Sequence, residues 1–544
     1  MLAVLAGLLI WVPALLGWGS LVLPALLGGR LCEDDDTGLA LRGFAGLGVL
    51  GTAGAALNLL VGLGPALAAG AALVGLALFA REAKVLGRTF TKADALALSG
   101  LALLVAFFAS GPIRLFDTGL YHLPAVAWTT AGPIPAGLAN LHRRFGLNSL
   151  WFPAAALLEL PLLAGRSAWL VSPLALLFFG SAVWKGARKT VAGTADASSV
   201  LLALGVFPLA VFSANEWLPS LSTDLPAATL TILASTLLLR QPCGRLERRA
   251  AVSLAFFAVM VKLSAAVFFA SVFLVARAFP LALLLPVVAW GARGIALSGY
   301  LVYPVVRTRL SFLPWAAPAA LAREEVDWAR SWARVPGRTL AETLTGNAWL
   351  SEWARATATK LSILLLFLLF AAGLAALLLA RRRPARSSGG RFVAVFAAAL
   401  ASTLFWFSSA PDPRFGYGAL FVLAALPLAA AIPRFTAAEI PLRLRWISAG
   451  LAAAALALSG VDFVVSGSGV RPSLVVPPEA RRPLSKELRT NDGETVFVPV
   501  MDACWDVPRP CTPYLDPALV IERDGSGRPR VFWLPPPSPT GSRP

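Results

Sequence analysis

Charged residues are scarce in this chain. Asp, Glu, Lys and Arg make up 14% of the 544 residues, hydrophobic residues make up 57%, and the mean hydropathy is +0.73. Because a soluble domain carries about 25% charged residues, this composition excludes an ordinary soluble protein. It predicts an integral membrane protein built from apolar helices.

A basic soluble domain is also absent, although the net charge is +18. Without such a domain a nucleic-acid partner is excluded. The Lys and Arg residues instead gather in every second connection between apolar segments, around positions 81–92, 185–189, 240–249, 381–391 and 434–445. The alternate connections 62–65 and 214–224 carry none. This is the cytoplasmic bias of basic residues, so the alternate connections are expected to face outward.

The first 27 residues lack the basic start of a secretory signal, so they are predicted to be a retained span. Apolar segments follow at 43–62, 65–80, 95–115, 167–184, 197–214, 225–239, 360–380, 391–409, 417–433 and 446–464, with three short helices expected in 250–297. The total is about 12–14 transmembrane helices. Ser149–Leu163 is predicted to be a membrane-surface or half-inserted helix, because a full crossing would move the Lys185 cluster outside. No internal repeat is seen, which argues against inverted-repeat transporters.

Two long loops and a polar tail divide the chain. We expect N-terminal membrane helices in 1–94, a catalytic membrane core in 95–297 that includes a first long loop (116–166), a second long loop (298–359), further membrane helices in 360–465, and a small C-terminal arm (466–544). A surface helix is expected from Pro318 to Arg334. Strands are expected at 494–500 and 530–534 of the arm.

Cysteine is rare, and two of the four cysteines lie close together in the arm. Cys504 and Cys511 are seven residues apart. In an oxidising compartment outside the cytoplasm they are predicted to form a disulfide. A metal site at this pair is less favoured, because neither of the two histidines of the chain lies nearby.

The stretch from Phe116 to His122 places a carboxylate, Asp117, and an imidazole, His122, just after a long apolar run. Ionisable groups near membrane depth are costly and tend to be functional. Partial burial under the first long loop would raise the pKa of Asp117 toward neutrality, where a carboxylate can act as a general base. The alternative is a helix cap, since Asp and Thr also begin turns.

A second acid, Asp224, begins the helix 225–239 at the same predicted face. Three cations are expected there too: Lys262 lies within an apolar stretch, and Arg293 and Arg414 lie at helix ends. Each alone could be a cap, an anchor or a snorkelling side chain. Together they would suit proton abstraction from an acceptor hydroxyl beside a bound phosphate or diphosphate.

The first long loop also carries polar groups suited to sugar hydroxyls or phosphates, namely Asn140, His142, Arg143 and Arg144, beside Pro133, Pro135 and Gly137. The predicted acceptor-binding set consists of Tyr121, Asn140, His142 and Arg143. The segment 133–148 is expected to be a mobile gate, and the alternative is a static amphipathic helix on the bilayer surface.

The order of these features resembles the GT-C superfamily of integral-membrane glycosyltransferases. The motifs D-T-G-L-Y-H-L-P-A, N-L-H-R-R-F-G-L-N, S-G-Y-L-V-Y-P, A-P-D-P-R-F-G and C-W-D-x-P-x-P-C-T-P are similar to a bacterial multi-pass membrane family without assigned substrate. The resemblance covers roughly 95–515. The chain departs from many members in having Thr118 after Asp117 rather than a second acid, and in having three spans before the Asp117 helix.

The resemblance implies a GT-C-like fold and transfer of a sugar from a polyprenyl-phosphate donor to a glycan, lipid or protein acceptor at the periplasmic face of a bacterial inner membrane. Asp117 would be the general base and Asp224 would support the acceptor. Lys262 and Arg293 would face the donor phosphate. The resemblance implies no particular cofactor, and a divalent metal at Asp117 and Asp224 is an open alternative. A glycolipid transporter or flippase, or a non-catalytic component of envelope assembly, are the rival functions.

Overall fold

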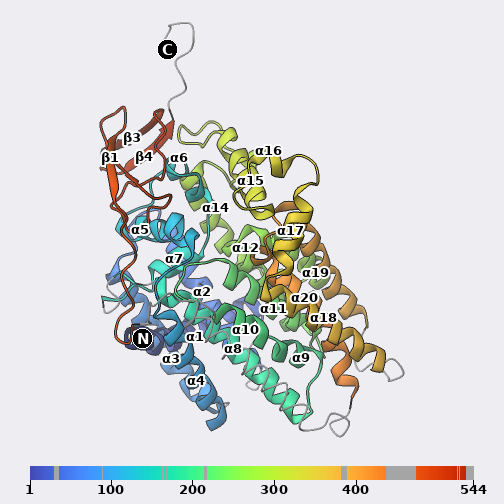
Figure 1. Ribbon diagram of the computed structural model, residues 1–544. Helices are drawn as coiled ribbons and strands as arrows, with labels where there is room; N and C mark the ends of the chain where they lie inside the picture. Colours follow the sequence, from blue (N-terminus) through green and yellow to red (C-terminus); the bar gives the residue numbers. More distant parts are fainter. Residues whose placement is uncertain are drawn as a thin grey trace.

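The computed structural model describes residues 1–29, 36–88, 90–161, 165–166, 168–213, 217–380, 389–435, 473–523, 525 and 527–533. Long helices form a slanted bundle, and the two hairpins of the C-terminal arm lie at one end of it (Figure 1). The predicted span at 446–464 lies outside the described residues. The described part is a membrane-embedded, mostly helical protein, as the composition indicates.

Nine helical segments of the described part are long and apolar enough to cross a membrane: Leu2–Leu27, Gly38–Leu57, Pro65–Lys84, Lys92–Ala109, Trp169–Ala192, Leu281–Ser298, Leu361–Ala380, Gly389–Ser409 and Pro413–Arg434. They belong to α1 (Leu2–Leu27), α2 (Gly38–Leu57), α3 (Pro65–Arg88), α4 (Lys92–Ala109), α8 (Ala168–Ala192), α14 (Leu284–Ser298), α18 (Leu361–Ala380), α19 (Gly389–Ser409) and α20 (Pro413–Ala431).

Shorter apolar helices complete the bundle: α9 (Ala197–Leu204), α10 (Val206–Ser213), α11 (Asp224–Leu239), α12 (Arg245–Val261) and α13 (Ala266–Ala276). The expected three short helices in 250–297 are therefore α12, α13 and α14. Lys262 ends α12 in an extended conformation, and a short 3-10 turn (Leu263–Ala265) leads into α13.

Glycines let the N-terminal helices approach closely. A Cβ at Gly19 of α1 would lie 1.8 Å from the carbonyl oxygen of Arg42, and a Cβ at Gly46 of α2 would lie 2.2 Å from that of Leu15. Small residues allow such backbone contact between membrane helices. Large side chains fill the rest of the core, where Trp11 and Trp169 are buried.

The basic connections meet at one end of the bundle. Arg391 donates to the carbonyl of Arg240, Arg240 donates to Thr37, and Lys189 pairs with Asp36. Asp94, at the start of α4, accepts from Lys185 and Arg188 of α8. The opposite end, where α4 and α12 end and α11 and α20 begin, is called the site end below.

Of the segment Ser149–Leu163 the structure describes 149–161, and every residue of this part except Pro161 is buried. Its helix is only α7 (Trp151–Ala156), all of whose residues are buried, and it packs against α2 and α5 (Leu123–Ala131). A helix of this length rises about 9 Å, so it cannot cross, as expected. The surface alternative was wrong because the apolar side chains are covered by protein on every face.

The second long loop forms three amphipathic helices at the site end, α15 (Ala319–Arg334), α16 (Leu340–Leu344) and α17 (Trp349–Ala358). The first of them is the helix expected from Pro318 to Arg334. It contacts α16 and α17, and also the 3-10 turn η2 (Arg143–Gly146) of the first long loop. The second long loop therefore packs onto the first.

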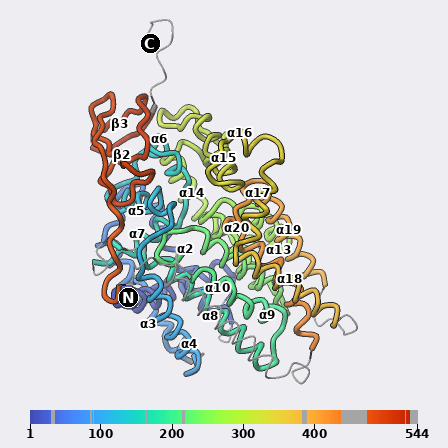
Figure 2. Tube along the Cα trace, viewed as in Figure 1, coloured from blue at the N-terminus to red at the C-terminus, as the bar shows by residue number. Residues whose placement is uncertain are grey.

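The C-terminal arm consists of two antiparallel hairpins, β1 (Ser485–Arg489) with β2 (Thr495–Pro499) and β3 (Leu519–Arg523) with β4 (Pro529–Trp533). Both expected strands are present. Cys504 and Cys511 form the expected disulfide between the hairpins. The arm runs along the first long loop, beside α5 and α6 (Leu138–Leu141) (Figure 2).

Candidate functional site

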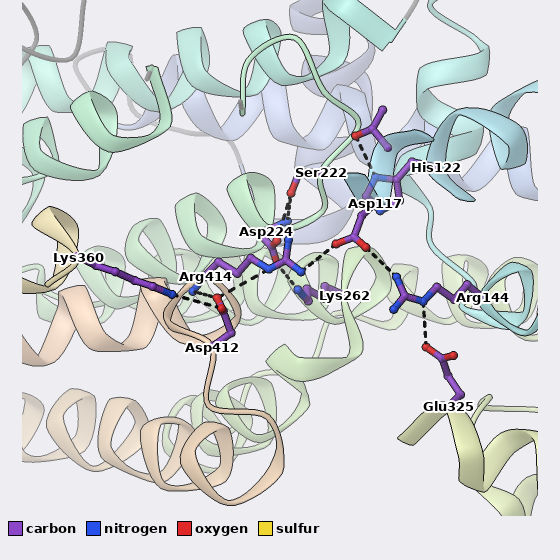
Figure 3. A network of polar contacts seen from close by, with 11 residues as sticks. Asp117, His122, Arg144, Ser222, Asp224, Lys262, Glu325, Lys360, Asp412 and Arg414 are labelled. Atoms are coloured by element: carbon purple, nitrogen blue, oxygen red, sulfur yellow. Dashed lines mark hydrogen bonds and ion pairs between the residues drawn. The ribbon is translucent and has the colours of Figure 1, made fainter. Parts of the chain in front are cut away.

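Asp117 lies at the site end, directly before a π-helix, η1 (Thr118–His122). The turn that follows α4 carries the chain to Asp117, whose side chain is 16% exposed. Single π-helical turns are rare and often occur at functional sites. Figure 3 shows Asp117 within a chain of ion pairs that runs from Lys360 and Asp412 through Arg414 and Asp117 to Arg144 and Glu325, with the separate pair of Asp224 and Lys262 beside it.

Two arginines hold the Asp117 carboxylate. Arg144 of η2 donates to Oδ1 at 2.7 Å, and Arg414 of α20 lies 2.9 Å from Oδ2. Burial acts to raise the pKa of Asp117, but the charges of Arg414 and then Arg144 outweigh it and lower the pKa to about 2. The expected shift of the Asp117 pKa toward neutrality was therefore wrong. Burial alone suggested that shift, whereas the two cations come from distant segments of the chain.

The A-P-D-P-R motif positions Arg414. Asp412 caps α20 by accepting a hydrogen bond from the Arg414 backbone N–H at 3.0 Å, and Pro413 occupies the first turn, where no N–H is needed. Lys360 lies 3.4 Å from the Asp412 carboxylate and Trp406 donates to its carbonyl. The start of α20 is thereby fixed, and the Arg414 side chain extends from it to Asp117 (Figure 3).

A second ion pair joins Asp224 and Lys262. Asp224 begins α11, where Ser222 receives its N–H at 3.1 Å and donates to its carboxylate at 3.3 Å. Lys262 pairs with the other carboxylate oxygen and lies 4.0 Å from the centre of the Phe415 ring. The capping interpretation of Asp224 was wrong, because Asp224 is the first residue of α11 and its N-cap is Thr223, whose side chain makes no capping hydrogen bond. The Asp224 carboxylate instead faces the Lys262 ammonium.

Helix α15 covers the ionic cluster, which consists of Asp117, Arg144, Asp224, Lys262 and Arg414. Trp328 stands over the Arg144 guanidinium at 4.2 Å, and Trp332 stands over that of Arg414 at 4.6 Å. Glu325 ties the helix down, since its carboxylate lies 2.9 Å from Arg143 and 3.4 Å from Arg144. Burial raises the pKa of Glu325 despite these arginines. The three α15 residues share one face of the helix, at spacings of three and four.

Beside the cluster lies a cavity of about 350 Å³, bounded by both long loops and the site ends of the helices. Its charged lining residues are Asp117, Arg144, Asp224, Lys262, Glu325, Arg330 and Arg414. Four cations thus face three carboxylates. The remaining wall is largely aromatic, with Phe152, Trp290, Tyr303, Trp328, Trp332 and Phe415. A cavity with this lining suits an anionic ligand that also carries a flat apolar or sugar face.

His122 and Tyr121 also line the cavity. Burial lowers the pKa of His122 to about 3, so the imidazole is neutral near pH 7. Its Nδ1 lies 3.4 Å from the Thr118 hydroxyl, and its ring packs against Tyr121 and Phe152. A neutral imidazole here can orient a hydroxyl group of a ligand.

Four of the predicted site residues do not line the cavity. Arg293 is buried against Asn148 and Thr129, to which it donates at 2.9 and 3.2 Å, so it joins α14 to the first long loop. Asn140 donates to the carbonyls of Trp315 and Val531. These two side chains are therefore hydrogen-bonded within the protein, where the sequence analysis expected Arg293 to contact phosphate and Asn140 to contact a sugar.

His142 and Arg143 are likewise occupied elsewhere. His142 is buried and accepts from the Arg144 backbone N–H at 3.3 Å, while Arg143 pairs with Glu325. The segment 133–148 is hydrogen-bonded to α14 and to β4, through Gly137 to Ala296 and Val531 to Ala136. Nothing in these contacts indicates the expected gate or the alternative helix on the bilayer surface.

Several lining residues were not identified as site residues from the sequence, among them Glu325, Trp328, Arg330 and Trp332 of α15. Arg144 was expected only as one of the polar groups of the segment 133–148. The i, i+3, i+7 spacing of Glu325, Trp328 and Trp332 was a usable signal, because it places them on one helical face. Arg144 could not be separated from Arg143 by sequence, since either neighbour could point inward.

A divalent metal does not fit the pair Asp117 and Asp224. Both oxygens of Asp117 lie against guanidinium groups, and Asp224 faces the Lys262 ammonium. Three cations around two carboxylates repel a further cation. Within the described residues, no group of three or more His, Cys, Asp or Glu side chains is placed to hold a metal ion.

Comparison with known proteins identifies the family of this chain. No curated protein matches the chain, and no solved structure does. A family model described as a domain of unknown function, DUF8201, matches residues 1–421. This range includes every residue of the ionic cluster and excludes the C-terminal arm. The chain therefore belongs to the DUF8201 family.

Proposed function

We propose that this protein is a membrane glycosyltransferase of the GT-C type, which moves a sugar from a polyprenyl-phosphate donor to an acceptor hydroxyl. The observation that carries the proposal is the Asp117 carboxylate held between Arg144 and Arg414 in an aromatic cavity at the ends of membrane helices. A base, phosphate-binding cations and ring-stacking side chains are thereby combined at one place.

Arg414 and Lys262 are the proposed phosphate ligands. Both line the cavity, and both lie beside Phe415, at 4.7 and 4.0 Å from its ring centre. The lining carries four cationic and three carboxylate side chains, so one bound negative charge would balance it. Arg binds phosphate oxygens through two parallel N–H groups, and Lys adds a compact charge.

Donor binding would activate the base. Arg414 contributes the largest favourable charge interaction that lowers the Asp117 pKa. When its guanidinium turns toward a phosphate, the Asp117 pKa rises from about 2 toward the range in which a carboxylate accepts a proton. The ion pair thus keeps Asp117 charged and in place until the donor arrives.

The transfer step follows from these positions. Asp117 accepts the proton of the acceptor hydroxyl as that oxygen bonds to the anomeric carbon. The bond from this carbon to the phosphate oxygen breaks, and the electron pair leaves with the phosphate, whose charge Arg414 and Lys262 stabilise. Direct displacement inverts the anomeric centre. His122 and Tyr121 line the same cavity and would orient the acceptor.

The cellular orientation is part of the proposal. The basic connections gather at the end opposite the site, which supports a site on the non-cytoplasmic face. The disulfide supports the same side for the arm, because such bonds persist in oxidising compartments. In a bacterial inner membrane this is the periplasmic face.

Reconstitution tests the function against the transporter alternative. Purified protein in sealed vesicles would receive a polyprenyl-phosphate sugar labelled in the sugar, together with a panel of glycan, lipid and peptide acceptors. Transfer releases unlabelled polyprenyl phosphate and a labelled product. Movement of intact labelled donor across the bilayer, with no cleavage, would support a flippase instead.

A further inference from the structure

The C-terminal arm reaches the π-helix that follows Asp117. Trp505 of the arm donates its backbone N–H to the carbonyl of Gly119 at 2.7 Å. The indole of Trp505 covers Gly119 closely, since a Cβ at Gly119 would lie 2.1 Å from the Trp505 Cε2. Trp505 is 7% exposed. Only glycine at position 119 allows the ring to lie this close to the backbone of η1.

The disulfide fixes the backbone that presents this tryptophan. Trp505 follows Cys504 directly and has a φ of 49°, in the left-handed region that large residues seldom occupy. The ring closed by Cys504 and Cys511 holds the loop, and Val507 donates back to the carbonyl of Cys504 at 2.9 Å. An unfavoured conformation persists where the surroundings overdetermine it.

Other contacts keep the arm on the same stretch of the first long loop. Val531 donates to the carbonyl of Ala136, Thr512 donates to that of Leu141, and Arg509 donates to that of Ala127. These contacts lie beyond η1. Trp505 therefore joins the arm to the π-helix whose residues Tyr121 and His122 line the cavity.

We propose that Trp505 is a positioning residue for Asp117 and His122, and that the Cys504–Cys511 disulfide makes this positioning sensitive to reduction. A dithiol reductant supplies two electrons and two protons, the S–S bond becomes two thiols, and the reductant becomes a disulfide. The freed loop relaxes from the left-handed conformation at Trp505 and withdraws the indole from Gly119. The π-helix then loses its outer support. The effect on transfer rests on the proposed function, whereas the effect on structure does not.

Hydrogen exchange of the full-length protein tests the structural part. Amides 118–122 should exchange about tenfold faster in Trp505→Ala and in the Cys504→Ser/Cys511→Ser double variant than in the wild type, while α1 and α2 exchange unchanged. Trp505→Phe should restore most of the protection. Tyr514→Ala is the matched control, because this aromatic arm residue contacts His142 and Arg143 rather than η1.

Unchanged exchange at 118–122 in the double variant and in Trp505→Ala, with α1 and α2 protected, would overturn the proposal. Equal acceleration by Tyr514→Ala would overturn it too, because any loss of arm packing would then suffice. Once a transfer assay exists, Trp505→Ala should lower kcat with little change in donor KM. If no donor is ever turned over but exchange responds as expected, the proposed function fails while the positioning role stands.

Discussion

The guanidinium of Arg414 at the start of α20 lies 2.9 Å from the carboxylate of Asp117 at the start of η1. This contact joins the last described membrane helix to the first long loop. Asp412 holds the backbone of Arg414, and Trp332 stands over its side chain. The candidate base and a candidate phosphate ligand therefore form an ion pair with each other.

Replacement of Asp117 should cost stability as well as activity. In Asp117→Asn, Arg144 and Arg414 lose the carboxylate that they share in a mostly buried site. We expect the free energy of unfolding to fall by about 3 kcal/mol at pH 7, as for other buried pairs that lose one partner. Denaturation in detergent would measure it, with exposed Asp506→Asn as the control. A change below about 0.5 kcal/mol would show that the ion pairs do not hold the loop.

The same carboxylate predicts a dependence of stability on pH. Its folded pKa of about 2 lies below the ordinary value of 3.8, so Asp117 stabilises the fold above about pH 4. This contribution, about 2 kcal/mol, is lost as the pH falls from about 4 to 2. The Asp117→Asn variant lacks this carboxylate and so has no such contribution to lose. The difference in unfolding free energy between wild type and variant should therefore become smaller as the pH falls. A constant gap from pH 6 to pH 3 would contradict the assignment.

Polyprenyl phosphate should bind at Arg414 and Lys262. The wild type should gain about 2.7 kcal/mol of stability at one hundred times the Kd, seen as a rise in Tm. Arg414→Gln and Lys262→Gln should each lose most of this ligand-induced rise, whatever their own starting Tm. Exposed Arg355→Gln on α17 should keep it. Arg293→Gln should also keep it, because Arg293 does not line the cavity. A full rise in both cavity variants would place the phosphate elsewhere.

The tryptophans of α15 should contribute to sugar binding. Trp332→Ala removes the ring over Arg414 and should raise the donor KM about tenfold, in the range of cation–π and stacking contacts. Trp349→Ala is a matched control, since Trp349 stands over Arg334 and does not line the cavity. Steady-state kinetics with varied donor would compare them. Equal increases of the donor KM in both variants would mean that donor binding depends on the packing of α15 and α17 and not on the Trp332 ring itself.

Asn140 should stabilise the packing of the C-terminal arm and should not bind the acceptor. Its amide donates to the carbonyls of Trp315 and Val531, so Asn140→Ala leaves one partly buried and one buried acceptor without this donor. The expected cost is about 1–3 kcal/mol, with faster hydrogen exchange in β3 and β4. Acceptor KM should change no more than donor KM. A selective rise in acceptor KM would restore the role expected from the sequence.

The convergence of Asp117, Asp224 and Arg414 could be predicted from the sequence because each lies at a helix end, and the alternation of basic connections assigns these ends to one side. Lys262 was expected near them only as a cation within an apolar stretch, and the structure shows that α12 ends there. Whether each side chain points into the cavity could not be predicted. Arg293 lies at a similar helix end but points to Asn148 and Thr129. Helical phase relative to neighbouring segments depends on packing between distant parts of the chain.

The loops were harder still. The Asn140 amide is held by the carbonyl of Val531, which lies in a β-strand of the arm far along the chain. The conformation of the 3-10 turn η2 determines that Arg144, and not Arg143, points into the cavity. The Asp117 pKa was misjudged for the same reason, since both cations that lower it come from other segments. Local sequence indicated burial, and only the tertiary structure supplies the charges that outweigh it.

The central claim is that Asp117 accepts the acceptor proton during transfer from a polyprenyl-phosphate sugar. Single-turnover transfer of a labelled sugar by wild type and Asp117→Asn, at a temperature where both are folded and with donor binding measured separately, tests it most directly. The account predicts a rate about a thousandfold lower in the variant with the donor still bound. A rate within about tenfold of wild type would contradict the account, because the proton would then be leaving by another group.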